Sequence, residues 1–109
     1  MKFSSALSKI AAPLARRFIA GTTLKDALDC ASKLSREGFL FTLDHLGEHI
    51  SNKREAEAAA ELYVVLLRAL KERSLPRNIS LKLSQLGMAI DRELCLKNLE
   101  RIVNATEEL

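Results

Sequence analysis

Two short apolar stretches, separated by a long helical pattern, limit the folds open to this chain. They occupy residues 38–48 (GFLFTLDHLGE) and 78–87 (NISLKLSQLG), and both run into polar residues and a glycine. Their alternating side chains predict strands at about 39–44 and 79–84, because successive residues of a strand point to opposite faces. Strands that alternate with helices form parallel sheets, whose ligand sites lie at the carboxyl ends of the strands.

Helical periodicity covers most of the remaining chain. Apolar residues recur at spacings of three and four in four segments, namely 3–20, about 23–37, about 53–73 and the residues after Asp91. Thr23 with Asp26, and Asn52 with Glu55, are start signals for the second and third segments. The predicted order is helix, helix, strand, helix, strand, helix, which indicates a right-handed parallel βαβ unit.

The two C-terminal helical segments each have a predicted buried face. In the longer segment it consists of Ala56, Ala59, Ala60, Tyr63, Leu66, Leu67 and Leu70. In the last segment it consists of Leu94, Cys95, Asn98 or Leu99, Ile102, Thr106 and Leu109.

Composition and charge indicate one globular domain at most. The chain has 109 residues, of which 48% are apolar and 28% charged. Its net charge of +3 is unevenly placed, since residues 1–25 contain five bases and no acid, which leaves 12 bases and 14 acids elsewhere. This balance predicts a basic arm on a mildly acidic body and argues against a nucleic-acid-binding domain. We expect the helix at 3–20 to pack on the body, with a membrane-surface or partner-binding arm as the alternative and a mitochondrial presequence as a third interpretation.

The cysteines indicate a reducing compartment, and the apolar segments argue against a membrane span and a signal peptide. Cys30 and Cys95 stand alone within helical patterns, so we expect buried free thiols. No stretch approaches the ~20 apolar residues of a membrane span. Arg16 and Arg17 interrupt the apolar segment that a signal peptide needs.

Three charged residues are candidates for a site at the strand ends. Asp44 closes the first apolar run, where it either serves a ligand site or accepts hydrogen bonds from turn amides, and Glu48 follows it. Lys82 lies near the end of the second run, so it would be in the interior unless solvent reaches it. A buried ammonium requires an anion. The anion for Lys82 is either a ligand carboxylate or phosphate, or a protein acid such as Asp44.

The run His45-Leu-Gly-Glu48-His49 matches a zinc-peptidase pattern, H-x-x-E-H. That chemistry requires both histidines on one helix. Here a glycine lies within the motif and a predicted strand directly precedes it. We therefore expect two loop histidines and no metal site.

Taken together, these motifs resemble a known family. Residues 38–48 and 79–87 are similar to the first two strand motifs of bacterial proline dehydrogenase, and residues 15–24 resemble its N-terminal helices. The resemblance covers nearly the whole chain. It implies a (β/α)8 barrel with FAD at its C-terminal mouth, oxidation of L-proline to Δ1-pyrroline-5-carboxylate by hydride transfer to the flavin, and quinone as the electron acceptor.

The resemblance also implies roles for individual residues. Lys82 matches the lysine that pairs with the proline carboxylate, and Asp44 matches the acid that closes the first strand, with a supporting role that we extend to Glu48. The family's main flavin contacts and its substrate-clamping arginines come from later strands. The implied location is the cytoplasm, at the inner membrane surface, and the basic helix at 3–20 is compatible with that location.

The resemblance predicts an incomplete barrel, because a (β/α)8 barrel requires about 250 residues. We expect residues 1–37 to form a helical arm and residues 38–109 to form the first two βα units, as a truncated piece that is inactive alone. The alternative is a non-catalytic interaction module that associates through open sheet edges or the basic helix. A third interpretation is another barrel enzyme that acts on a carboxylate substrate.

Overall fold

The computed structural model describes residues 23–45 and 49–108. The predicted basic helix at 3–20, the candidate residue Glu48 and the predicted core residue Leu109 lie outside the described residues.

The chain divides into two compact units at the boundary between Phe41 and Thr42. In the first unit, helix α2 spans Leu24–Arg36. The second unit contains, in chain order, β1 (Leu43–Asp44), α3 (Lys53–Glu72), β2 (Ile79–Ser80), the 3₁₀ helix η1 (Leu83–Leu86) and α4 (Arg92–Glu108). This order confirms the predicted strand-helix-strand-helix sequence after the helical segment that contains α2.

Local side-chain caps explain where the helices begin. The Thr23 hydroxyl accepts a hydrogen bond from the Asp26 amide at 3.1 Å, and the Asn52 side chain accepts one from the Glu55 amide at 2.9 Å. The Asp91 carboxylate likewise accepts from the Glu93 amide at 2.9 Å. Each bond satisfies an amide that has no partner within the helix. The predicted helix starts are confirmed.

The predicted lengths of the two strands are wrong. β1 and β2 pair in parallel, as predicted, but each has two residues, with Leu43 opposite Ile79 and Asp44 opposite Ser80. Residues 39–42 have no regular secondary structure. Residues 83–84, the predicted end of the second strand, instead begin η1. The reason for the early end of the ladder lies at the candidate site below.

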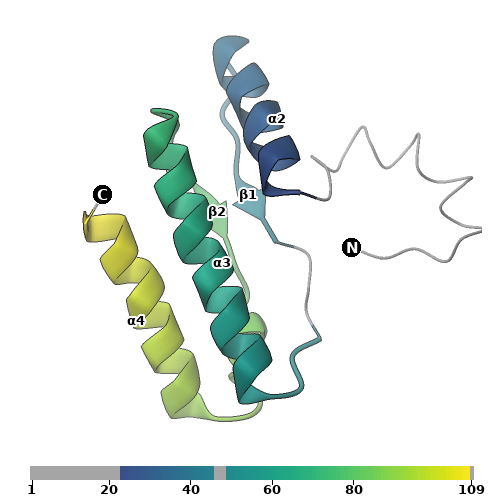
Figure 1. The fold of residues 1–109 in the computed structure, drawn as a ribbon, viewed down its shortest axis with the longest axis vertical. Coiled ribbons are helices and arrows are strands. Elements are labelled where there is room, and N and C mark those ends of the chain that lie inside the picture. The colour runs from purple at the N-terminus through teal and green to yellow at the C-terminus, as the bar shows by residue number, and fades with distance from the viewer. Residues whose placement is uncertain (1–22, 46–48, 109) are drawn as a thin grey trace, which may run out of the picture. The chain divides into compact units, whose positions relative to one another are not determined.

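The core of the second unit lies between α3, α4 and η1. Figure 1 shows α3 and α4 packed side by side. All seven residues of the predicted face of α3 are buried, as are Leu94, Cys95, Asn98 and Ile102 of α4. Thr106 is a correction: it is exposed, and Ala105 is buried in its place. The buried stripe advances by three residues after Ile102, which the helical repeat of 3.6 allows as readily as four.

Candidate substrate-binding site at the strand ends

Asp44 and Lys82 are carried by adjacent strand ends. Asp44 is the last residue of β1 and pairs in register with Ser80, the last residue of β2. Lys82 follows two residues later and keeps an extended backbone (φ −112°, ψ 138°). The alternation of an extended chain therefore places Asp44, Ser80 and Lys82 on one face.

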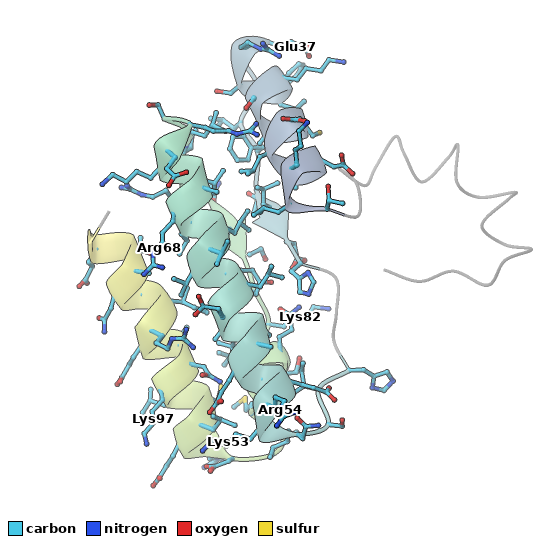
Figure 2. All side chains as sticks on the ribbon, in the orientation of Figure 1. Glu37, Lys53, Arg54, Arg68, Lys82 and Lys97 are labelled. Carbon is cyan, nitrogen blue, oxygen red and sulfur yellow. The ribbon has the colours of Figure 1, made fainter. Side chains whose placement is uncertain are left out.

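Lys82 differs from its predicted position in one respect. It lies just beyond β2 and immediately before η1, not within a strand. Its side chain is exposed, so solvent reaches it, and in Figure 2 it lies on the side of α3 away from α4. Asp44 is also exposed. Both charged groups are thus accessible to a dissolved ligand.

The hydroxyl of Tyr63 interrupts the ladder directly after these strands. The Leu43 amide donates to the Asn78 carbonyl at 3.0 Å, so the same register two residues on would pair the His45 amide with the Ser80 carbonyl. Instead, the His45 amide donates to the Tyr63 hydroxyl at 3.3 Å, and that hydroxyl lies 3.1 Å from the Ser80 carbonyl oxygen. One side chain of α3 thus takes the place of one direct backbone hydrogen bond between the strands, that is, one rung of the ladder.

Gln85 occupies the next rung. In the continued register the Lys82 amide would donate to the His45 carbonyl. In the structure the Lys82 amide donates to Gln85 Oε1 at 3.0 Å, and Gln85 Nε2 donates to the His45 carbonyl at 2.6 Å. The side-chain amide therefore bridges the two backbone groups. We call Tyr63 and Gln85 together the strand wedge.

The strand wedge is fully enclosed by protein. Tyr63 is 0% exposed and Gln85 is 1% exposed. The Tyr63 hydroxyl lies 3.0 Å from Gln85 Oε1 and 3.3 Å from the Asp44 carboxylate, in addition to its contact with Ser80. A hydroxyl has one proton, so it donates to one of these oxygens at a time. Within the described part of the chain, no buried side-chain nitrogen or oxygen is without a hydrogen-bond partner.

The two wedge residues were not predicted as site residues. Tyr63 was assigned to the apolar face of its helix and Gln85 appeared only within the second strand motif. One signal in the sequence was available for Tyr63, because a phenol on a fully buried helix face requires a partner for its hydroxyl. The position of that partner depends on the fold.

Burial raises the pKa of Tyr63 above its ordinary value of 10.0, and the nearby Asp44 charge raises the pKa further, while the His45 amide opposes the shift. The neutral phenol is therefore favoured in the folded state. Its contribution to stability is fully present below about pH 10 and is lost as the pH rises through the raised pKa.

We expect the tyrosinate absorbance of the folded chain to titrate with a midpoint above 10.0. Tyr63 is the single tyrosine and the chain has no tryptophan, so this ultraviolet signal reports on one residue. The same titration in urea should give a midpoint of about 10. Equal midpoints in the two solvents, for a chain that circular dichroism shows to be helical in buffer, would contradict the buried position of the Tyr63 hydroxyl.

The histidines and cysteines of the described residues do not gather into a site. The His45 ring packs edge-on against Tyr63, with centroids 6.4 Å apart, while His49 is exposed. Residues 23–45 and 49–108 contain no cluster of three or more His, Cys, Asp or Glu side chains suited to a metal ion. Cys30 and Cys95 are free thiols, of which Cys95 is buried and Cys30 half-buried, and burial raises the pKa of Cys95.

The two described glycines, Gly38 and Gly87, do not form a phosphate-binding turn. A phosphate-binding turn brings glycines and free amides to the start of a helix. Gly87, in contrast, is packed against Ala56 and Leu94, and Gly38 follows the C-terminal end of α2. We therefore assign no flavin chemistry to these residues. Across the same described ranges, no helix is long and apolar enough to cross a membrane.

Comparison with known proteins identifies what the chain is related to. It is 35% identical to proline dehydrogenase 1 of Bacillus subtilis (strain 168) over 94 residues, which is 86% of this chain and 31% of the relative. The chain is homologous to part of proline dehydrogenase. The proline dehydrogenase of Deinococcus radiodurans is 32% identical over 98 residues, and proline dehydrogenase 2 of B. subtilis is 27% identical over 94.

The match covers most of this chain but only part of each relative. The chain spans about a third of the length of the proline dehydrogenases that it matches. No protein-family model matches the chain. The resemblance inferred from the strand motifs is confirmed, and the short span is consistent with an N-terminal portion of such an enzyme.

Proposed function

We propose that this chain provides the first two βα units of an FAD-dependent proline dehydrogenase with a (β/α)8 barrel. The observation that carries the proposal is the position of Asp44 and Lys82 at the carboxyl ends of neighbouring parallel strands. Ligand sites of such barrels lie at this edge. The homology to proline dehydrogenases gives the class of substrate.

In this proposal Lys82 binds the carboxylate of L-proline. A lysine ammonium forms charge-assisted hydrogen bonds with a carboxylate, and its accessible position lets a dissolved amino acid reach it. Asp44 lies on the same face and has a supporting role, as does Glu48. The flavin would be bound by parts of the barrel beyond the described residues, and quinone is the proposed electron acceptor.

The proposed location follows from the family and from the charge of the N-terminal arm. Residues 1–25 contain five bases and no acid. Such a segment is attracted to the anionic surface of a membrane. We propose a cytoplasmic enzyme whose arm, residues 1–37, contacts the inner membrane surface where quinone is available.

A chimeric enzyme tests the function. In this chimera, the 94 matched residues of this chain replace the corresponding segment of B. subtilis proline dehydrogenase 1. We expect the chimera to bind flavin and to reduce a dye acceptor when L-proline is added. Residues 1–109 alone should show no such activity, because the two strands of the described residues do not enclose a barrel site.

Two results would contradict the proposal. One is a folded chimera with bound flavin that does not respond to proline. The other is a response that is equal for L-proline and for a cyclic amine without the carboxylate, because the proposed role of Lys82 requires that group.

A second candidate function rests on the sheet itself. Within the described residues the sheet has two strands, so each strand has an edge without a β partner. Such edges pair readily with other chains. As an interaction module the isolated chain would be a folded monomer that binds a strand from a partner. Size-exclusion chromatography with thermal melting distinguishes the cases, since a barrel piece would aggregate or melt without cooperativity.

A further inference from the structure

The strand wedge explains why the ladder ends at Asp44 and Ser80. Two consecutive rungs beyond them are occupied by side chains, the first by the Tyr63 hydroxyl and the second by the Gln85 amide. Each side chain accepts from a backbone amide, Tyr63 from that of His45 and Gln85 from that of Lys82. Gln85 donates to the His45 carbonyl, and the Tyr63 hydroxyl lies within hydrogen-bond distance of the Ser80 carbonyl. The backbone groups keep hydrogen-bond partners, but the strands are held farther apart than a direct rung would hold them.

The positions of the wedge contacts connect it to the candidate site. Tyr63 contacts the Asp44 carboxylate at 3.3 Å, and Gln85 holds the backbone amide of Lys82 at 3.0 Å. Both wedge residues are buried and have few conformations available. A change in either side chain would therefore be transmitted to the residue that carries a candidate ligand-binding group.

We propose that Tyr63 and Gln85 are positioning residues that hold the ends of β1 and β2 apart and thereby set the distance between Asp44 and Lys82 at which the substrate carboxylate is bound. This inference rests on the proposed function for its substrate. The geometry of the wedge does not depend on that function, so an experiment can reject the wedge without rejecting the proposed function, and the reverse.

The wedge makes a specific structural prediction. In Tyr63→Phe the hydroxyl is absent, and the His45 amide and the Ser80 carbonyl both lose a partner. Because leaving buried backbone groups without partners is unfavourable, we expect these two groups to form the direct rung, with a nitrogen–oxygen distance of about 2.9 Å. A crystal structure of the Tyr63→Phe chimera measures this distance. Strand ends that stay as far apart as in the unsubstituted chimera would overturn the proposal.

The kinetic prediction separates positioning from stability. We expect Tyr63→Phe to raise the KM for L-proline about five- to tenfold, as expected for one weakened hydrogen bond, while kcat per bound flavin changes less than twofold. Gln85→Met, which keeps the length of the side chain and removes its amide, should have the same effect. It also tests the wedge independently if Tyr63→Phe does not fold.

Asn98 offers a matched control for Gln85. Its side chain is also a buried amide, 3% exposed, and it donates to the Leu86 carbonyl at 3.0 Å, a group of η1 that belongs to neither strand. Asn98→Leu should lower the melting temperature and leave KM unchanged. Equal KM values for Tyr63→Phe, Gln85→Met and the unsubstituted chimera would reduce the wedge to a structural feature. An unsubstituted chimera that does not oxidise proline would instead reject the proposed function, and the crystallographic distance would still decide the wedge.

Discussion

Lys82→Met should raise the KM of the chimera for L-proline roughly 10- to 100-fold and leave its flavin content unchanged. A hydrogen bond to a charged group contributes about 1.5–3 kcal/mol, and 1.4 kcal/mol corresponds to a factor of ten in affinity. Methionine keeps an unbranched side chain of similar length and removes the charge. Because Lys82 is exposed, the substitution should have little effect on folding.

Lys97→Met is the control for this experiment. Lys97 is an exposed lysine on α4, and Figure 2 shows it on the other side of α3 from Lys82. Its replacement by methionine removes the same charge outside the proposed site, so the KM for L-proline should change less than twofold. A Lys82→Met chimera with unchanged KM would remove Lys82 from the substrate site. Loss of flavin in that chimera would assign it to cofactor binding instead.

In the chimera, Gly87→Ala should lower the free energy of unfolding by about 2–5 kcal/mol. Gly87 has φ +95°, where a side chain costs about 1–2 kcal/mol. An added Cβ would also lie 3.1 Å from Ala56 Cβ and 3.1 Å from Leu94 Cδ2. An alanine Cβ cannot rotate away, so α3 itself would have to shift, and such overpacking costs about 1–3 kcal/mol. Urea unfolding followed by circular dichroism measures the change.

Gly38→Ala separates the two contributions. Gly38 has a similar φ of +85°, but an added Cβ there would have no atom within 4 Å. We expect this variant to lose only the conformational part, about 1–2 kcal/mol. Equal losses in the two variants would show that the contact between η1, α3 and α4 at Gly87 is looser than the structure indicates.

The helices and their buried faces were predictable because they depend on neighbouring residues. Asn52 satisfies an amide three positions away, and the apolar face of α3 follows the helical repeat through residues 56–70. The family was also recognisable, since its signature lies in two contiguous stretches. Asp44 and Lys82 were candidates because charged residues at the ends of apolar runs are unusual.

The sequence by itself determined the helix positions, the parallel pairing of two apolar runs and the relationship to proline dehydrogenases. Only the tertiary structure decided where the strands end. The hydrogen bonds that replace the ladder join His45 to Tyr63, 18 residues away, and to Gln85, 40 residues away. The alternating pattern of residues 79–84 predicts a strand, and nothing local to it indicates that a phenol from α3 will occupy the next rung. The wedge depends on α3 packing beside both strand ends, which no short-range pattern specifies.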